Sequence, residues 1–356
     1  MDIPQRLTLA SQAVEVIKKM IEAGELENFL PGERSLAQTL QIGRDTLRAA
    51  LKELEKQRWI SIGEHGKKRK ILAKIAAENK KKKRTSIGFV SPKKLEELPP
   101  RMLVEIDTLR EMLAQRDIDF QVVTPGVFHL KRPETRLEEM VSQSQYDAWI
   151  LYQCPEPIQR WFSEQKVLCL VRGSVYPGVK FPSLDVDWGA AGVHAANMLI
   201  SQGHSSIGLL VPDTELQGLL ATEDGVKSAL AKVDGSTLHV IKESRTVESI
   251  TIAMQKALRK DAPPTAIITT RSRQVLTLLS WLAFHGVRIP RDISVVSLDY
   301  DQLYEALVPK MCYFNADSKK IARDMMRRID LLLQGSMSSR KLIMSEYYSG
   351  ASVAKL

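Results

Sequence analysis

Four residues near position 45 combine side-chain types that can recognise nucleic acid. Arg44 and Arg48 carry planar guanidinium groups, which can donate two parallel hydrogen bonds to a guanine edge or to a phosphate. Thr46 can reach a base or a phosphate, and Asp45 can accept a hydrogen bond from cytosine. An equally good role for Asp45 is to stabilise the N-terminal end of a helix. The spacing of these residues therefore indicates DNA contact from the start of one helix.

The elements that must position these residues follow from the apolar spacing of the first 75 residues. Apolar side chains first recur every three or four positions, which predicts helices, and then flank a glycine-containing tip, which predicts two short strands. The predicted helices span residues 7–23, 33–40 and 44–59, and the predicted strands span residues 60–62 and 67–72. Three helices followed by such a hairpin make a winged helix-turn-helix, whose third helix enters the major groove of DNA.

The positive charge of the chain is concentrated in the same region. The whole chain has 51 Lys and Arg against 42 Asp and Glu, which is a net charge of +9. Residues 1–85 hold 19 of the basic residues and 11 of the acidic ones, so they account for +8. A small domain with this much basic charge is typical of proteins that bind a polyanion such as DNA.

Two stretches of this region carry a family resemblance. Residues 30–37, LPGERSLA, and residues 43–51, GRDTLRAAL, resemble the signature of the GntR family of bacterial regulators. In that family, arginines on the second and third helices and a histidine-glycine pair at the wing tip commonly contact DNA. The resemblance implies this role for Arg34, Arg44, Arg48, His65 and Gly66, with Thr46 and Lys67 as helpers. The alternatives are a solvated helix residue for Arg48 and an ordinary loop histidine for His65.

Residues 76–85 have no apolar pattern and contain five consecutive positive charges from Lys80 to Arg84. Like charges repel one another, so we expect this linker to be extended when it is free. It is either a hinge that becomes ordered against the phosphate backbone or a solvated connector. A nuclear address is a third interpretation, which a bacterial host would disfavour.

From residue 86 onward, short apolar runs alternate with amphipathic helical stretches. This alternation predicts repeated β/α units, and a loop rich in proline and glycine at residues 177–182 divides them into two groups. We therefore predict an α/β fold with two lobes, each a parallel sheet flanked by helices. Ligands of such folds bind beyond the C-terminal ends of the strands, which places the ligand in a cleft between the lobes.

The second half of the chain carries another resemblance. Residues 286–299, GVRIPRDISVVSLD, and residues 195–208, AANMLISQGHSSIG, resemble the effector domain of LacI-type repressors. That domain is similar to the periplasmic sugar-binding proteins of type I. The resemblance implies two lobes joined by crossovers, with a helix at 318–334 and a strand at 341–348 returning through both. It also implies a sugar-responsive bacterial regulator, since GntR-type DNA-binding domains, here called heads, occur joined to such effector domains.

The predicted cleft differs from a sugar site at several positions. Where sugar-binding relatives commonly have an arginine that binds hydroxyl groups, this chain has Thr222. Arg172 and Arg271 stand where those relatives usually have acidic or amide side chains. Because arginine pairs with carboxylate and phosphate groups, we predict an anionic ligand, such as a sugar acid or a sugar phosphate, held by these two arginines.

The alternative is that both arginines pair with nearby carboxylates, of which Asp185, Asp187 and Asp299 are the candidates, and that the pocket is altered or empty. Asp299 also matches an acidic position that contacts sugar hydroxyls in the relatives, although a turn cap is its other interpretation. Ser91 and Tyr152 follow the first and third predicted strands and are further candidates for effector contact.

Several other classes of protein do not fit the sequence. We find no run of about 20 apolar residues and no secretion signal, so a membrane protein, an exported protein and a transport-type binding protein are all disfavoured. Motifs of phosphate-binding loops, α/β-hydrolases and zinc proteases are absent, so we expect no enzyme, no catalytic residue and no cofactor. The chain has three widely spaced cysteines, Cys154, Cys169 and Cys312. Their spacing predicts no metal site and favours the reducing cytoplasm.

We therefore predict a cytoplasmic, dimeric transcription regulator, and we favour a repressor over an activator. Its expected parts are a DNA-binding domain at 1–75, the linker at 76–85 and an effector-binding and dimerisation domain at 86–356. Its partners would be a double-stranded operator and a small-molecule effector that is a sugar, a sugar acid or a sugar phosphate. The alternatives are a regulator with a degenerate pocket controlled by a protein partner and, with little support, an α/β enzyme.

Overall fold

The computed structural model describes residues 8–22, 25–26, 28–62, 68–72, 84–144, 146–165, 167–336 and 339–356. The chain divides into two compact units, Met1–Arg84 and Thr85–Leu356. The predicted linker at 76–85 falls almost wholly outside the described residues, as do His65, Gly66 and Lys67 of the predicted wing. In the described part of the chain, no helix is both long enough and apolar enough to cross a membrane.

The first unit forms the predicted helix-turn-helix. Its described helices are α1 (Leu9–Glu22), α2 (Glu33–Thr39) and α3 (Arg44–Lys56). Gly32 and Gly43 occupy the N-cap positions of α2 and α3, so each of these helices begins directly after a glycine. The inner face of α3 is buried against α1 and α2, and the buried residues are Leu47, Ala50, Leu51 and Leu54. The opposite face of α3 is thereby left to solvent.

Of the predicted wing strands, the structure describes residues 60–62 and 68–72. Within these residues, isolated antiparallel bridges join Ile60 to Ile71 and Lys70 to Phe29, and no regular strand is formed. The backbone N–H of Ser61 donates to the Lys70 carbonyl at 2.7 Å, which fixes the base of the hairpin.

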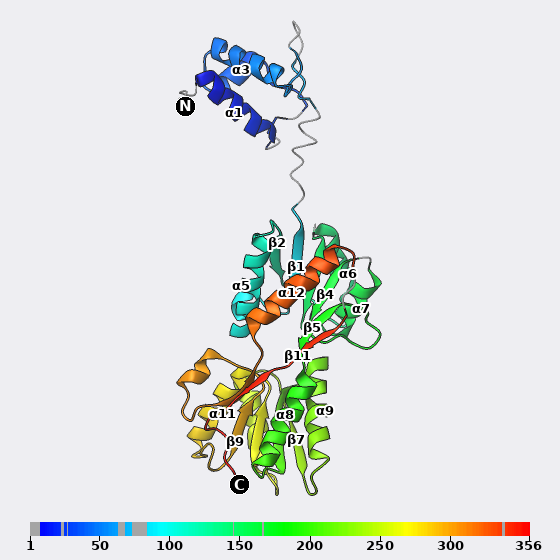
Figure 1. Ribbon diagram of the computed structural model, residues 1–356, viewed down its shortest axis with the longest axis vertical. Helices are drawn as coiled ribbons and strands as arrows, with labels where there is room; N and C mark the ends of the chain where they lie inside the picture. Colours follow the sequence, from blue (N-terminus) through cyan, green and yellow to red (C-terminus); the bar gives the residue numbers. More distant parts are fainter. Residues whose placement is uncertain are drawn as a thin grey trace, which may run out of the picture. The chain divides into compact units, whose positions relative to one another are not determined.

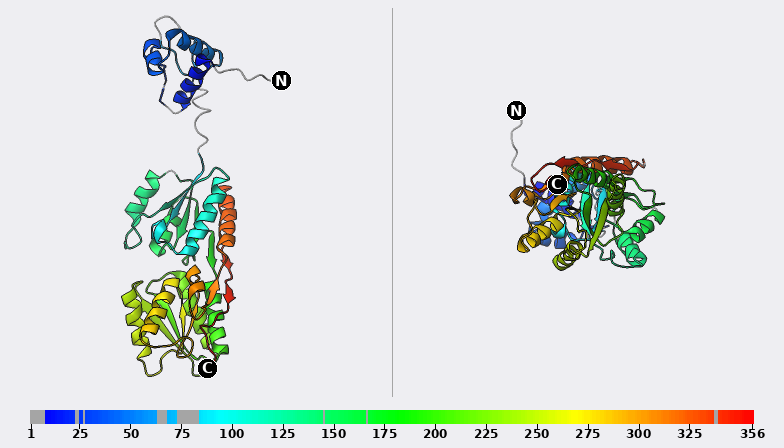
Figure 2. Two further views of the ribbon diagram at one scale, coloured as in Figure 1. Left: turned by 90° about the vertical axis from the view of Figure 1, so that its left-hand side faces the viewer. Right: turned by 90° about the horizontal axis from the view of Figure 1, so that it is seen from below.

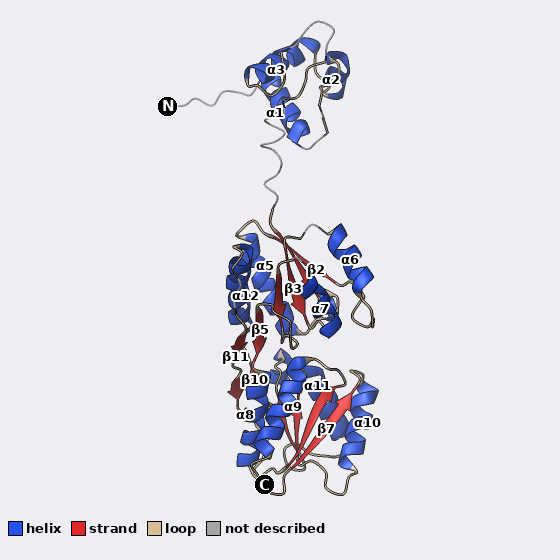
Figure 3. Cartoon of the chain, turned by 90° about the vertical axis from the view of Figure 1, so that its right-hand side faces the viewer, coloured by secondary structure: helices blue, strands red, loops and turns tan. Residues whose placement is uncertain are grey.

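The second unit has two α/β lobes (Figure 1). The N-lobe sheet has the order β11-β5-β4-β3-β1-β2, and every pair of neighbours in it is parallel. Helices α5 and α12 cover one face of this sheet, and α6 and α7 cover the other (Figure 3). The elements are β1 (Ser86–Val90), η1 (Leu95–Glu97), α5 (Pro100–Ala114), β2 (Asp119–Val123), α6 (Glu134–Gln143), β3 (Ala148–Tyr152), α7 (Glu156–Glu164), β4 (Cys169–Arg172), β5 (Ser183–Val186), α12 (Ser318–Leu333) and β11 (Lys341–Ile343).

The C-lobe repeats this plan with the order β12-β10-β9-β8-β6-β7, in which only the edge pair β10 and β12 is antiparallel among the described strands. Helices α8 and α9 cover one face, and α10 and α11 the other. The elements are α8 (Trp188–Ser201), β6 (Ser206–Pro212), α9 (Gln217–Leu230), β7 (Thr237–Glu243), α10 (Val247–Leu258), β8 (Ala266–Thr269), α11 (Ser272–Phe284), β9 (Ser294–Ser297), η2 (Gln302–Ala306), β10 (Cys312–Asn315) and β12 (Glu346–Tyr348).

The last part of the chain returns through both lobes, as the second resemblance implied. Helix α12 packs against α5 of the N-lobe, and the C-terminus lies on the C-lobe (Figure 2). The single strand predicted at 341–348 is instead two strands, β11 in the N-lobe sheet and β12 in the C-lobe sheet. Both sheets are therefore completed by late residues, so neither lobe is a continuous segment of sequence.

Close packing of α8 on α9 depends on small residues. A Cβ atom at Gly225 would lie 2.3 Å from the Gly189 carbonyl oxygen, and one at Gly192 would lie 2.6 Å from the Thr222 carbonyl oxygen. Thr222 itself is fully buried, and its hydroxyl donates to the Gly218 carbonyl at 2.9 Å. The residue at the position where sugar-binding relatives have an arginine thus belongs to this helix interface.

Candidate functional site

The start of α3 presents the residues predicted to contact DNA. Arg44, Asp45 and Arg48 are exposed, and Thr46 is half-buried. Arg34, in the first turn of α2, is also exposed. On α3, the exposed residues lie on the face opposite the buried apolar one. The helix can therefore contact a partner through them without disturbing the core.

Arg48 is not a freely solvated side chain. Its Nε donates to Oε2 of Glu33 at 3.1 Å, and its side chain remains 59% exposed. Arg69, at the base of the hairpin, donates from Nη1 to Oε1 of Glu33 at 3.0 Å and from Nε to Glu55 at 2.7 Å. Hydrogen bonds from Arg48 and Arg69 lower the pKa of Glu33 from its usual 4.5. Glu33 therefore ties α2 to both the recognition helix and the hairpin.

The sequence did not single out Glu33 or Arg69 as a connected pair. They are 36 residues apart, and only the fold brings them together. A basic residue within a predicted strand and an acidic residue in the first turn of a helix are individually common, so neither carried a signal on its own.

Two adjoining pockets lie between the lobes and share Tyr152, Gln153 and Arg271. The smaller has a volume of about 60 Å³ and the larger about 300 Å³. Only the larger of these two reaches the size usual for small-molecule sites. Its wall is drawn from both lobes, from the segment after β1 and the start of α5 on one side and from the ends of β7, β8 and β9 on the other.

Arg172 is committed to the protein itself. Its side chain is 2% exposed and donates two hydrogen bonds to Glu105, at 2.8 and 3.0 Å, and one to Asp185 at 3.2 Å. Burial acts to lower the pKa of Arg172, but the carboxylates of Glu105 and Asp185 together outweigh it and raise the pKa. The structure thus supports the alternative in which this arginine pairs with Asp185 rather than with a ligand. Asp187 instead caps α8 by accepting from the Ala190 N–H at 2.9 Å.

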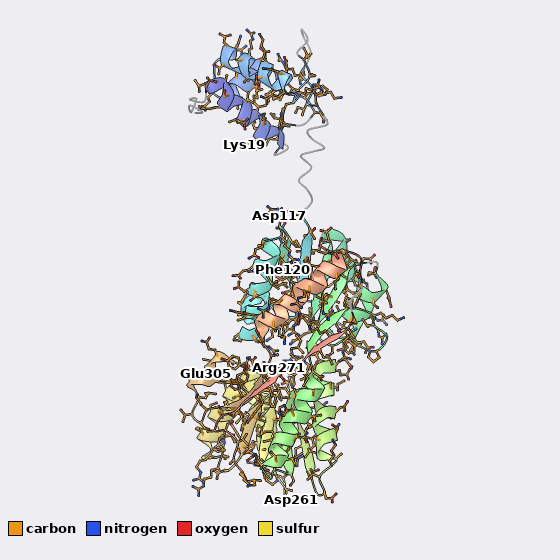
Figure 4. The ribbon with its side chains drawn as sticks, viewed as in Figure 1. Lys19, Asp117, Phe120, Asp261, Arg271 and Glu305 are labelled. Carbon is orange, nitrogen blue, oxygen red and sulfur yellow. The ribbon has the colours of Figure 1, made fainter. Side chains whose placement is uncertain are left out.

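Arg271 has the opposite surroundings. It follows β8 and directly precedes α11, and its side chain lines both pockets. Its backbone N–H donates to Gln274 at 3.0 Å, whereas its guanidinium has no ion pair or hydrogen bond among the residues that the structure describes. Figure 4 shows Arg271 at the end of the C-lobe that faces the N-lobe.

Tyr152 lies at the end of β3 beside the arginines. It is buried, and its hydroxyl accepts from Gln153 at 3.0 Å. Burial raises the pKa of Tyr152, and the positive charges of Arg271, Arg101 and Arg172 act against this rise. The phenol therefore remains a neutral hydrogen-bonding group on the floor of the cleft.

Asp299 follows β9 and is 3% exposed. Its Oδ2 accepts from the Ser272 N–H at 3.3 Å, and its Oδ1 lies 3.7 Å from Nη1 of Arg101. Oδ1 has no hydrogen bond within the described residues. Arg101 comes from α5 of the N-lobe and also lies over the Trp188 ring at 5.6 Å. It joins the two lobes, and sequence reasoning missed it because it looks like any basic residue in a helix.

Ser91 does not line either pocket in the described part of the chain. Its hydroxyl donates to the Lys93 carbonyl at 2.8 Å and accepts from the Lys93 N–H at 3.2 Å. Both bonds close the turn after β1, so Ser91 stabilises this turn rather than contacting an effector as the sequence predicted. Groups of three or more potential metal ligands are likewise not found in the residues that the structure describes.

Comparisons with known proteins agree with both resemblances. Residues 9–66 match the sequence profile of bacterial regulatory proteins of the gntR family, and residues 196–353 match that of a periplasmic binding protein-like domain. The chain joins a gntR-family domain to a periplasmic binding protein-like domain. The fold class predicted from the sequence, a winged helix-turn-helix followed by a two-lobed α/β domain, is confirmed.

The relatives are transcription regulators rather than enzymes. The transcriptional repressor CytR of Escherichia coli strain K12 is 24% identical over 211 residues, which is 58% of this chain and 62% of that protein. The chain thus matches less than two thirds of that relative's length. A transcription regulator-like protein from Staphylococcus haemolyticus has the same fold, with a TM-score of 0.67, 18% identity and coverage of 77% of this chain and 100% of that one.

One further solved structure contains a ligand. A LacI-family regulator from Enterococcus faecium, with bound ribose, has a TM-score of 0.64 and 17% identity, and covers 76% of this chain and 100% of that chain. At this level of identity the likeness shows the fold alone.

Proposed function

We propose that the protein is a DNA-binding transcription regulator, most simply a repressor, whose operator affinity is set by a small molecule bound between the two lobes. The observation that carries the proposal is the union of two parts in one chain. A gntR-family head exposes arginines at the start of α3, and a two-lobed domain has a cavity of about 300 Å³ between its lobes. A cytoplasmic location belongs to this proposal, because such a regulator acts on the chromosome.

The DNA contacts that we propose are made by the α2–α3 surface and by the wing. Arg44 and Arg48 would read base edges, helped by Thr46 and with Asp45 either at a base or at the helix end. Arg34 would hold the phosphate backbone. His65, Gly66 and Lys67 remain candidates from the family resemblance, outside the described residues.

The mechanism that we propose is a change in the spacing of two heads. Two chains would form a homodimer through residues 86–356, with residues 1–75 as the heads and 76–85 as the linkers. A ligand that closes the cleft would move one lobe against the other and so change how well both heads fit an operator. The effector would then change the affinity for the operator by a certain factor, and the operator would change the affinity for the effector by the same factor.

The effector that we propose is a sugar or an anionic sugar derivative. Support comes from the ribose-bound LacI-family structure and from Tyr152 and Asp299 in the cleft wall. It also comes from Arg271, whose guanidinium has no ion pair among the described residues. The alternative is a degenerate pocket in a regulator that a protein partner controls. In that case no small molecule would occupy the cavity.

The test is operator binding by head variants. The wild-type chain would first select its operator from random duplexes, and Arg44→Ala and Arg48→Ala would then be compared by gel shift at physiological salt. Each arginine that reads a guanine contributes about 1–3 kcal/mol, so we expect a loss of affinity of roughly 5- to 150-fold. Lys19→Ala, an exposed residue of α1, removes the same charge and serves as the control. If both arginine variants bound the operator with unchanged affinity, the proposed DNA contacts of Arg44 and Arg48 would be wrong.

A further inference from the structure

Two arginines of the C-lobe converge on the larger pocket from neighbouring loops. Arg245 follows β7, and Arg271 follows β8. Strands β7 and β8 flank β6 and run parallel to it, so their C-terminal ends lie at the same edge of the sheet. Both arginines line the larger pocket. The sequence hypothesis paired Arg271 with Arg172, whereas the structure offers Arg245 as the second cation.

A buried polar network fixes the backbone of both arginines. Glu243 accepts from the Arg245 backbone N–H and, at 2.9 Å, from the Gln274 side chain. Gln274 in turn accepts from the backbone N–H groups of Thr270 at 2.9 Å and Arg271 at 3.0 Å. Glu243 and Gln274 are both buried. Because they are bonded to each other, this network holds the two loops in a fixed relation.

The backbone at Arg245 is held in an unusual conformation. Its φ is +66°, in the left-handed region that side chains other than glycine seldom adopt. In this conformation the Arg245 N–H donates to the Glu243 carboxylate. Strain of this kind persists only where the surrounding structure holds it in place, and it gathers at binding sites. Here the side chain that is placed belongs to the pocket wall.

The charges around the pocket are unevenly satisfied. The carboxylates in its wall already have partners. Glu243 accepts two hydrogen bonds, and Asp299 lies near Arg101. Asp301 accepts from the Leu303 N–H at 3.0 Å, and Glu97 from the Lys94 N–H at 3.3 Å. For Arg245 and Arg271, by contrast, the described residues provide no ion pair within 4 Å. Burial lowers the pKa of Arg245, and the nearby charge of Arg271 lowers it further. An anion held between the two guanidinium groups would relieve their mutual repulsion.

We propose that Arg245 and Arg271 form a binding subsite for a phosphate monoester on the C-lobe wall of the cleft. A carboxylate carries one negative charge and is satisfied by one bidentate arginine. A phosphate monoester carries about −1.5 to −2 charges at pH 7 and three acceptor oxygens, which matches two guanidinium forks. The effector would then be a small phosphorylated metabolite, a sugar phosphate being the simplest. That the bound phosphate regulates DNA binding rests on the proposed function.

The test is titration of the full-length chain with inorganic phosphate and with glucose 6-phosphate, glucuronate and glucose at constant ionic strength. Binding is followed by calorimetry and by the rise in the thermal midpoint. We expect both phosphates to bind more tightly than glucuronate and glucose. Arg245→Gln and Arg271→Gln should each weaken phosphate binding by about tenfold or more, because a charge-assisted hydrogen bond is lost. Arg259→Gln, an exposed arginine at the end of α10, is the control for charge.

Folding defects are separated from lost contacts by a second pair of variants. Arg245→Lys and Arg271→Lys keep the charge and remove the fork, so they should retain the wild-type thermal midpoint and still bind phosphate more weakly. The inference is overturned if neither phosphate binds saturably. It is also overturned if the arginine variants bind phosphate like wild type, or if glucuronate binds best and depends on Arg271 alone.

Operator binding by the same preparations separates this inference from the proposed function. A chain that binds its selected operator but no phosphate would overturn the phosphate subsite and leave the regulator intact. A chain that binds phosphate but selects no DNA would overturn the proposed function and leave the subsite in place.

Discussion

Arg172 in the N-lobe and Arg271 in the C-lobe occupy similar places in opposite walls of the cleft. Arg172 ends β4 and Arg271 lies just beyond the end of β8, and both line the smaller pocket. Yet Glu105 and Asp185 engage every nitrogen of the Arg172 guanidinium, whereas Arg271 has no such partner in the described chain. The difference shows that an arginine at a strand end serves the fold when neighbouring elements bring carboxylates to it, and is available to a ligand when they do not.

The largest effect expected from this comparison is on stability. Arg172→Met would leave Glu105, which is fully buried, and Asp185 without their cation. Removing one partner of a buried ion pair costs about 3–5 kcal/mol, so the free energy of unfolding should fall by that amount. Urea unfolding of the full chain measures it, with the transition of the second unit followed by hydrogen exchange.

Arg288→Met is the matched control for this variant. Arg288 pairs with Asp292 at 2.9 Å, but the arginine is 59% exposed and the pair is screened by solvent. We therefore expect a much smaller fall in the free energy of unfolding than for Arg172→Met. Equal losses in the two variants would mean that burial does not distinguish the two arginines.

A smaller effect is expected at the contact that crosses the cleft. Arg101→Met would leave the buried Oδ1 of Asp299 with no cation within 4 Å among the described groups. A buried charged acceptor without a partner costs about 1–3 kcal/mol, and Asp299→Asn in the same chain should recover most of it. A double-mutant cycle by urea unfolding gives the coupling, and additive losses would show that the two residues do not interact.

How far the sequence predicts this molecule depends on whether the signal is local. Helices α1 and α3 and the buried central strands follow from apolar patterns, and short sequence motifs indicate both domain families. Strand β5 is not predictable in this way, because its residues Ser183 and Asp185 are polar yet buried and it shows no apolar run. Strand β10 was missed for a similar reason, since its CYFN sequence is short and mixed.

The candidate site was less predictable, because its charges are paired through the fold. Glu105 lies 67 residues from Arg172, and no spacing rule joins them. Arg245 lies in a turn, where a basic residue is unremarkable until β7 and β8 are known to end at the same edge. The sequence therefore indicated the type of residue in the cleft, and only the tertiary structure distinguishes the paired from the unpaired arginines.

The smallest effect is expected in the DNA-binding head, whose arginine pairs are more exposed. Glu33→Gln should cost about 0.5–1 kcal/mol, because Arg48 and Arg69 lose a charged acceptor at a partly solvated site. The pKa of Glu33 is lowered by folding, so its stabilisation is present above its usual value of 4.5 and is lost as the pH falls through the lowered value.

Hydrogen exchange of the head amides in the full chain, at about pH 6 and at lower pH, measures this pH dependence. The wild-type head should lose protection on acidification by more than the Glu33→Gln head does. Glu15→Gln, at an exposed pair with Lys18, provides the control. An identical pH dependence in wild type and Glu33→Gln would show that Glu33 does not tie the three elements together.

The most direct test of the account compares thermal unfolding of Arg172→Met and Arg271→Met, each with and without inorganic phosphate. We predict that Arg172→Met lowers the midpoint in both conditions. Arg271→Met should keep the wild-type midpoint without phosphate and lose the rise that phosphate causes in the wild type. The account is contradicted if Arg271→Met unfolds as early as Arg172→Met, or if phosphate stabilises it as much as it stabilises the wild type.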